Sequence, residues 1–286
     1  MKVAAVSDGW DSSATYVLEG LKKYSKHDWT IYQYQPEIGD ADVVYYHVGA
    51  LLSELNPMML RQFNGTTIKK AAGLRGEMNY KRWAEDYYPV TKLRSWVYEL
   101  DAVACSNRYY YNEMKRFNLN AHLCPSGVDA ESFTPQPYPD EFTVGFVGNP
   151  EHGAKNYALF KSLPFKQRYA SSIPHNEMLD FYKSISVLVC CSWHEGSPVP
   201  PKEAAFCGKP TVAFNVGDLR DWLPEELIAK DREDVIMKLN MLKDNPELTK
   251  EYGLKCRERV ESYNFINVAP LYDKMLESVS EATIRL

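Results

Sequence analysis

The sequence has no apolar run that is long enough to cross a membrane. A spanning helix needs about 20 apolar residues, whereas the run Ile185–Cys191, one of the longest here, is interrupted by Ser186. The segment Met1–Asp8 is apolar too briefly for a signal peptide and predicts a first strand instead. We therefore expect no integral membrane segment.

Cysteine is scarce, and its spacing does not match a metal site. The six cysteines include no Cys-x-x-Cys pair, and Cys190 and Cys191 lie inside an apolar run. Buried, reduced thiols in a cytoplasmic protein are the better interpretation. We therefore predict a cytoplasmic location and no metal site. The carboxylates of Asp40 and Asp42 are interpreted as the solvated entry to a strand.

No charge of one sign dominates the chain. Its 286 residues include 33 Lys and Arg against 38 Asp and Glu, for a formal net charge of -5. This mild acidity disfavours indiscriminate binding to nucleic acids or anionic membranes. Hydrophobic residues make up 45% of the chain, and glycine and proline are few, at 15 and 17. Disordered, collagen-like and low-complexity proteins are thus excluded, and roughly one to three globular domains are expected.

Short apolar runs alternate along the chain with amphipathic stretches such as 14–24 and 108–117. This alternation predicts an α/β fold, with parallel sheets covered by helices on both faces. The apolar run that starts at Val187 does not alternate with polar residues, as expected for a strand buried on both sides. The predicted strands are residues 2–6, 29–33, 43–47, 102–106, 121–124, 143–147, 187–192 and 211–215.

Proline marks a boundary near the middle of the chain. Pro135, Pro137 and Pro139 fall within five residues, a spacing that excludes a helix interior or a central strand. We interpret this segment as a linker between two Rossmann-like halves that face across a cleft. Ligands of such sheets bind beyond the carboxyl ends of the strands. The chain from residue 231 onward is predicted to be helical, and its last helix, 268–280, has one apolar face.

The most informative loop follows the strand predicted at 187–192. It contains Glu195, and Glu203 lies in the first turn of the short helix that comes next. A carboxylate at such a sheet edge accepts hydrogen bonds from a vicinal diol, as in ribose recognition. The loop amides of Gly196, Ser197 and Val199, together with the helix N-terminus, would meet an anion. The alternative for either glutamate is a favourable interaction with the helix dipole alone.

Four motifs in a fixed order then resemble one known family. Two glutamates are separated by seven residues and followed by Gly208-Lys209-Pro210. The other three motifs are Pro125–Asp129, Val144–Gly148 with Lys155 and Asn156, and Asp42–His47. Over about residues 40–225 the chain resembles the family-4 glycosyltransferases of the GT-B fold.

The resemblance implies roles for individual residues. Glu203 would bind the ribose hydroxyls of a nucleotide-sugar, and Glu195 would contact hydroxyls of the donor sugar. Lys155 would neutralise the diphosphate leaving group, and His47 would lie across the cleft near the transferred sugar. His47, Glu195 and Lys155 are therefore the candidate catalytic residues.

The same family places glycines in the loops after strands, where the backbone approaches the phosphates. Gly9 and Gly148 are the corresponding positions here. The resemblance implies an acceptor-side domain at 1–135, a nucleotide-sugar-binding domain at 140–267, and a C-terminal segment, 268–286, that packs back onto the first. It also implies retaining transfer of a hexosyl group, usually from a UDP-sugar, without a metal or any cofactor other than the donor.

Departures from the family pattern keep two alternatives open. The family usually has an arginine after the donor-domain glycine, where this chain has Asn149, and Arg75 is a candidate substitute. Tyr45 replaces the first histidine of the acceptor-domain strand. One alternative is therefore a non-catalytic module that binds a saccharide or nucleotide. The other is a GT-B sugar-nucleotide epimerase, which the spacing of the two glutamates disfavours.

The acceptor is not identified by the sequence. Residues 69–96 form a locally basic region interleaved with Tyr80, Trp83 and Trp96. Such a region suits an anionic acceptor, such as a phosphorylated glycan, a lipid phosphate or modified DNA. A solvated helix face with ordinary tryptophan packing is the alternative.

Overall fold

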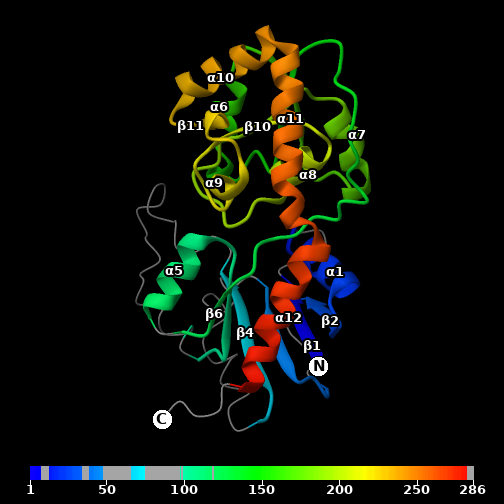
Figure 1. The fold of residues 1–286 in the computed structure, drawn as a ribbon, viewed down its shortest axis with the longest axis vertical. Helices are drawn as coiled ribbons and strands as arrows, with labels where there is room; N and C mark the ends of the chain where they lie inside the picture. The colour runs from blue at the N-terminus through cyan, green and yellow to red at the C-terminus, as the bar shows by residue number, and fades with distance from the viewer. Residues whose placement is uncertain are drawn as a thin grey trace. The chain divides into compact units, whose positions relative to one another are not determined.

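The computed structural model describes residues 1–7, 13–33, 39–47, 66–74, 97, 99–117 and 119–281. The chain divides into two compact units (Figure 1). Unit 1 comprises Met1–Gly127 together with Phe265–Leu286, and unit 2 comprises Val128–Asn264. Each unit is built on its own parallel sheet.

The described strands of unit 1 form a sheet in the order β2-β1-β3-β4-β5-β6, with every neighbouring pair parallel. β3 and β5 are buried along their whole length, as expected for strands covered on both faces. The elements before the last helix are β1 (Lys2–Ser7), α1 (Ser13–Tyr24), β2 (Asp28–Gln33), β3 (Val43–Tyr46), β4 (Lys69–Leu74), β5 (Ala102–Cys105), α5 (Arg108–Arg116) and β6 (Ala121–Leu123).

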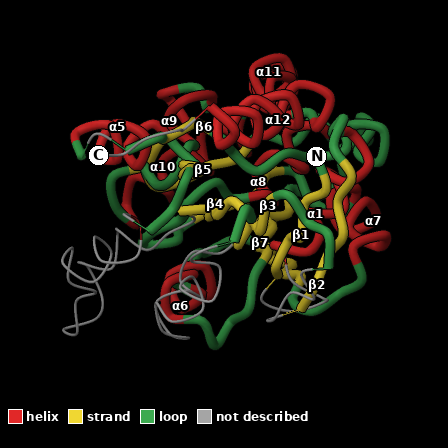
Figure 2. Tube along the Cα trace, turned by 90° about the horizontal axis from the view of Figure 1, so that it is seen from below, coloured by secondary structure: helices red, strands yellow, loops and turns green. Residues whose placement is uncertain are grey.

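Helix α12 (Phe265–Glu281) completes unit 1 although it is the last helix of the chain. It packs against α1 and against strands β4, β5 and β6, and Figure 2 shows it running over this sheet. At the start of the helix, the ring of Phe265 packs directly on the backbone of Gly20 and Gly127. A Cβ added at either glycine would come within 2.1 or 2.5 Å of the ring, so only glycine leaves room for it. The predicted return of the last helix to the N-terminal half is confirmed.

Unit 2 has a second parallel sheet, in the order β11-β10-β9-β7-β8. Its strands are β7 (Thr143–Val147), β8 (Lys166–Ala170), β9 (Val187–Cys190), β10 (Thr211–Phe214) and β11 (Ile228–Ala229). Its helices are α6 (Tyr157–Lys161), α7 (Met178–Lys183), α8 (Val199–Phe206), α9 (Leu219–Trp222), α10 (Arg232–Asp244) and α11 (Pro246–Val260). Its 3₁₀ helices are Gly153–Lys155, His175–Glu177, Glu225–Leu227 and Glu261–Tyr263.

The proline-rich segment belongs to unit 2 and is anchored to the end of α8. Tyr138 Oη donates to the carbonyl of Gly208 at 2.6 Å, and Lys209 Nζ donates to the carbonyl of Pro137 at 2.6 Å. The Lys209 ammonium also lies 4.1 Å from the centre of the Tyr138 ring. The chain passes between the units before this segment, at Gly127 and Val128, rather than at the expected linker. The prolines exclude regular secondary structure from this segment. The carbonyl of Pro137 and the side chain of Tyr138 still make contacts that hold the segment to unit 2.

Every strand predicted from the sequence is present, with its end shifted by one or two residues in several cases. Within the region after residue 231 that was predicted to be helical, residues 246–260 form one helix, α11, which is followed by a 3₁₀ turn. Strands β4, β8 and β11 were not predicted. All three are edge strands or start with charged residues, so they lack an apolar pattern of their own.

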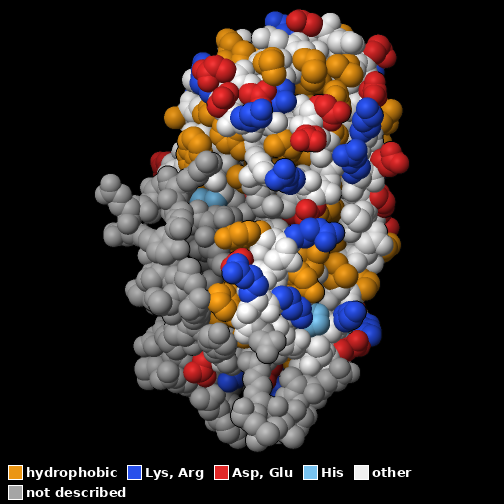
Figure 3. All heavy atoms as spheres, turned by 60° about the vertical axis from the view of Figure 1, so that its left-hand side comes forward, with side chains coloured by type: hydrophobic (Ala, Val, Ile, Leu, Met, Phe, Trp, Pro, Cys, Tyr) orange, Lys and Arg blue, Asp and Glu red, His pale blue; other side chains and the backbone are white. Residues whose placement is uncertain are grey.

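On the face in Figure 3, the described surface carries basic and acidic side chains interspersed with apolar ones. This agrees with the small net charge of the sequence. Among the described residues, no helix combines the length and the apolar character that crossing a membrane requires.

Candidate functional site

The order of the strands in unit 2 creates a crevice suited to a ligand. From β7 the chain first adds β8 on one side of the strand. It then adds β9 on the opposite side of β7, and β10 next to β9, so the direction of strand addition reverses between β8 and β9. Parallel sheets bind ligands at such a reversal, beyond the carboxyl ends of the two strands. The loops that leave β7 and β9 carry Gly148, Lys155, Ser192 and Glu195.

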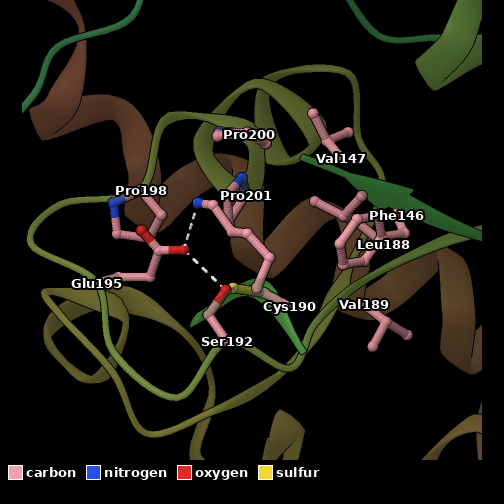
Figure 4. Close-up of a pocket in the computed structure, with 11 residues that line it drawn as sticks. Phe146, Val147, Leu188, Val189, Cys190, Ser192, Glu195, Pro198, Pro200 and Pro201 are labelled. Carbon is pink, nitrogen blue, oxygen red and sulfur yellow. Dashed lines mark hydrogen bonds and ion pairs between the residues drawn. The ribbon is translucent and has the colours of Figure 1, made fainter. Parts of the chain in front are cut away.

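Lys155 and Glu195 form an ion pair where these two loops meet. Lys155 Nζ lies 2.6 Å from Glu195 Oε1, and Ser192 Oγ donates to the same oxygen at 2.7 Å; Figure 4 marks both interactions. The side chains of the pair are 29% and 14% exposed, so a ligand can reach them. Burial opposes both charges, but their mutual attraction and hydrogen bond outweigh it. The pKa of Lys155 is therefore raised and that of Glu195 lowered.

Two unusual backbone conformations bring Lys155 to this place. Gly148 has φ +148°, and a Cβ there would lie 3.4 Å from the Lys155 side chain. Asn156 is left-handed, with φ 54°, and its Nδ2 donates to the carbonyl of Cys191 at 3.1 Å. The amide of Trp193 donates to the carbonyl of Ala154 at 2.8 Å. The loop after β7 is thus tied to the loop after β9.

The ion pair also lines a small pocket (Figure 4). Lys155, Glu195 and Ser192 are its polar residues. The apolar part of the wall consists of Phe146, Val147, Leu188, Val189, Cys190, Pro198, Pro200 and Pro201. A pocket with an apolar wall and a few convergent polar groups is the usual form of a small-molecule site.

Glu203 lies in α8 and is almost completely buried, at 2% exposure. Its Oε2 accepts a hydrogen bond from Tyr182 Oη at 2.6 Å, and His175 Nε2 lies 3.6 Å from Oε1. Among the described residues, none donates a hydrogen bond to Oε1. Burial raises the pKa of Glu203 to about 7, against the lowering effect of the Tyr182 hydrogen bond.

Aromatic side chains surround the buried carboxylate of Glu203. Phe133 meets His175 and Tyr182 edge to face, with ring centres 5.4 and 5.8 Å away. These rings hold the tyrosine hydroxyl against the carboxylate and keep water away from it. A buried carboxylate with one unsatisfied oxygen is costly unless a ligand supplies the missing hydrogen bonds.

The loop before α8 differs in part from the sequence prediction. Ser197 and Val199 are buried, at 8% and 6% exposure, and Pro198 is the N-cap of the helix without a side-chain cap. The hydroxyl of Ser197 bonds within the protein, because it donates to Asp218 and accepts from Lys202 at 2.6 Å. Only the backbone of Ser197 therefore stays a candidate for ligand contact, as the sequence analysis supposed.

The candidate residues of unit 1 are described only in part. His47 follows β3 and is buried, at 2% exposure; its amide donates to the carbonyl of Val6 at 3.1 Å, and its Nδ1 lies 3.3 Å from Tyr45 Oη. Gly9 and Arg75 lie outside the described residues, as does most of the basic region after Lys70.

Asn149, which stands where the family has an arginine, does not replace its charge. Its Oδ1 accepts a hydrogen bond from the amide of Glu151 at 2.9 Å and so closes a turn. Lys155 is accordingly the cation that the structure places on Glu195. The described residues contain no group of three or more His, Cys, Asp or Glu side chains arranged to hold a metal ion.

Sequence reasoning missed several residues of this site. Ser192, Tyr182 and His175 contact the two glutamates, and Lys202 and Asp218 hold the loop between them. Of these five residues, the sequence could have indicated only Ser192 and Lys202 as part of the site, since each lies within three residues of a predicted glutamate. The others come from segments whose approach depends on the fold.

A comparison with protein-family models decides what this unit is. Residues 139–258 match the model described as "Glycosyl transferases group 1". Over this range, unit 2 is similar to a group 1 glycosyltransferase domain. The matched range contains Lys155, Glu195 and Glu203, so the ion pair and the buried carboxylate are features of that glycosyltransferase domain. Among curated protein sequences, none matches the chain significantly.

Solved structures resemble the chain over its whole length. Sucrose-phosphate synthase from Thermosynechococcus elongatus has a TM-score of 0.80 at 14% identity, covering 99% of this chain and 100% of that one. Anabaena Alr3699/HepE in complex with UDP has a TM-score of 0.71 at 11% identity, covering 97% and 100%. A trehalose-6-phosphate structure from E. coli bound with UDP-2-fluoro glucose has 0.73 at 10% identity, covering 100% of both chains. The likeness establishes the fold, and the predicted GT-B fold is confirmed.

Proposed function

We propose that the protein is a retaining glycosyltransferase that moves a hexosyl group from a UDP-sugar to an acceptor hydroxyl without a metal ion. The observation that carries this proposal is the unsatisfied Oε1 of buried Glu203, at the same sheet edge as the Lys155–Glu195 pair. Structures with this fold contain UDP, UDP-glucose or UDP-2-fluoro glucose, which supports a UDP-linked donor.

Glu203 is assigned to the ribose of the donor. A ribose diol brings two O–H donors, and the carboxylate has one oxygen that lacks a hydrogen bond from the described residues. Binding of the diol would therefore satisfy a buried group that is otherwise costly. The carboxylate accepts both hydroxyls only when it is ionised, so donor binding favours loss of its proton.

Lys155 is assigned to the diphosphate, and Glu195 to the hydroxyls of the donor sugar. In the reaction, the bond between the anomeric carbon and the diphosphate oxygen breaks, and its electron pair leaves with UDP. The acceptor oxygen bonds to the same carbon and loses its proton. Negative charge grows on the leaving diphosphate, and a cation already in place stabilises it without reorganisation. Gly148, Gly196, Ser197 and Val199 are assigned to backbone contacts with the donor.

Retention is proposed from the family resemblance and not from a carboxylate nucleophile. Glu195 Oε1 is already engaged by Lys155 and Ser192, an arrangement that suits orientation of a sugar hydroxyl. His47 is assigned to the acceptor side of the reaction. We also propose a cytoplasmic location, because all six cysteines are buried thiols that form no disulfide among the described residues.

Thermal unfolding with a panel of UDP-, GDP-, ADP-, CMP- and TDP-sugars, in the presence of a chelator, tests this proposal. A donor at 100 times its dissociation constant should stabilise the protein by about 2.7 kcal/mol. Glu203→Ala should remove the shift, whereas Glu258→Ala, an exposed glutamate on α11, should retain it. A panel in which no nucleotide-sugar shifts the parent protein would refute the proposal.

Asn149 favours one second candidate, a GT-B module that binds a nucleotide-sugar but does not transfer the sugar. Its amide side chain supplies no charge for the leaving diphosphate, so the site has one cation fewer than the family pattern. Measuring UDP release from bound UDP-glucose separates the two. Binding without release, with water or with any acceptor supplied, would favour the module.

A further inference from the structure

A second ion pair lies deeper in unit 2 than the Lys155–Glu195 pair. Lys202 of α8 and Asp218, after β10, are 0% and 1% exposed, and Lys202 Nζ lies 2.8 Å from Asp218 Oδ2. Both groups also bond to Ser197, whose hydroxyl accepts from Lys202 at 2.6 Å and donates to Asp218. The three residues come from α8, from the loop after β10 and from the loop after β9. We call them the Lys202–Asp218–Ser197 network.

Stability alone does not explain two charges at this place. Removing two ions from water carries a large desolvation penalty, and apolar residues of the same volume often serve a fold equally well. Asp218 Oδ1 accepts no hydrogen bond from the described residues, which adds to the penalty. A buried ion pair does, however, impose a definite geometry on the groups that it contacts.

The group held here is the loop that carries Glu195. Ser197 lies two residues after Glu195 and one residue before Pro198, and both of these line the pocket. The loop after β10 also approaches the same place through its backbone. Gly217 has φ 59°, and a Cβ there would lie only 2.7 Å from the carbonyl oxygen of Gly196. Both the network and this contact hold the loop against the turn at Gly217.

The network also reaches the point where the chain leaves unit 2. The Lys202 ammonium lies 4.6 Å from the centre of the Tyr263 ring. The carbonyl of Tyr263 accepts a hydrogen bond from the amide of Val128 at 2.9 Å. Val128 and Asn264 are the first and last residues of unit 2. The network that holds the loop therefore also contacts the segment at which the chain enters and leaves unit 2.

We propose that Lys202 and Asp218 are positioning residues for donor binding, which act by holding Ser197 and thereby fixing Glu195 in the pocket wall. This inference rests on the proposed function. It assigns to the network the sugar and diphosphate part of the donor. The nucleoside part is left to Glu203, which contacts Tyr182 and His175 instead.

The test compares the dissociation constants of UDP-glucose and of uridine, which lacks both the diphosphate and the sugar. Ser197→Ala removes the hydroxyl that links the loop to the ion pair but leaves the pair itself. We expect its affinity for UDP-glucose to fall at least tenfold, while uridine binds within twofold of the parent. Lys202→Met should lower the affinity for UDP-glucose further, again with little change in the affinity for uridine. Ser186→Ala is the matched control, because this buried hydroxyl accepts a hydrogen bond from the amide of Thr143, the first residue of β7.

The outcomes are distinct. If Ser197→Ala keeps the parent's affinity for UDP-glucose, or loses affinity for uridine to the same extent, the network is merely structural and the inference is wrong. The result with Ser197→Ala decides the question even if Lys202→Met does not fold. If the parent protein itself binds neither UDP-glucose nor another nucleotide-sugar, the proposed function fails as well.

Discussion

Replacing Glu203 by glutamine should make the free protein more stable and at the same time remove donor binding. The carboxylate is buried, its Oε1 lacks a hydrogen bond from the described residues, and its pKa is raised to about 7. Glutamine has the same shape and still accepts a hydrogen bond from Tyr182, but it carries no charge. The substitution therefore removes the penalty of a buried anion without leaving a cavity.

The magnitude follows from the pKa of Glu203 in the two states. The pKa is about 7 in the folded protein, against an ordinary value of 4.5 for a glutamate. The folded protein therefore binds the proton more tightly, and stability falls as pH rises between the two values. Each unit of difference corresponds to about 1.4 kcal/mol. The penalty is absent below pH 4.5 and reaches about 3 kcal/mol above pH 7. Between pH 5.5 and pH 8 it grows by about 2 kcal/mol.

Denaturant unfolding of the parent and of Glu203→Gln at pH 5.5 and pH 8 measures this difference. The variant should be the more stable protein, by about 1 kcal/mol at the lower pH and about 3 kcal/mol at the higher. Glu258→Gln, on the exposed side of α11, serves as the control and should not change the pH dependence. A gap between parent and Glu203→Gln that stays constant with pH would refute the reasoning, because the carboxylate would then not titrate in this range.

Three further predictions concern ligand binding and backbone strain. The dissociation constant of UDP-glucose should rise about tenfold from pH 8 to pH 6, because only ionised Glu203 would accept both ribose hydroxyls. Calorimetry on the parent and on the exposed control Glu258→Gln should give the same pH profile. Lys155→Met should weaken the affinity for UDP-glucose by roughly 10- to 100-fold, the usual contribution of a charge-assisted hydrogen bond, as measured by the same titration. Gly217→Ala and Gly208→Ala, both at positive φ, should each lower stability by about 1–2 kcal/mol. Only Gly217→Ala, which would press on Gly196, should also weaken donor binding.

The strands that the sequence predicted are those with an apolar pattern of their own. Val43–Tyr46 and Val187–Cys190 are buried along their length and are read directly from consecutive apolar residues. Strand β4 begins with Lys69 and Lys70, and it becomes a strand because β3 and β5 pair with it on both sides. Strand β8 lies at the edge of its sheet and is mostly polar, which protects an exposed edge and hides the pattern.

The candidate site was predictable only to the extent that it repeats a motif. The spacing of Glu195 and Glu203 identified both glutamates, and the resemblance added Lys155, but neither indicated that Lys155 and Glu195 touch. That contact depends on the left-handed backbone of Asn156. Lys202 and Asp218 would be assigned to the surface on composition, since charged residues are seldom fully buried. They are found inside because each supplies the charge that the other needs.

In the proposed function, the ion pair at the pocket would let one site bind both an anion and a set of hydroxyls. A carboxylate beside a diphosphate would repel it, and Glu195 is only 14% exposed, so solvent screens little of its charge. Lys155 cancels that repulsion, and its ammonium has three N–H donors, enough to contact a phosphate without releasing Glu195. In the proposed site, Lys155 would therefore have two roles: it would attract the diphosphate, and it would offset the repulsion between the diphosphate and Glu195. Asn149 stands where the family has an arginine, and Lys155 is the cation among the described residues that line the pocket, so the proposed site would depend on both roles of Lys155.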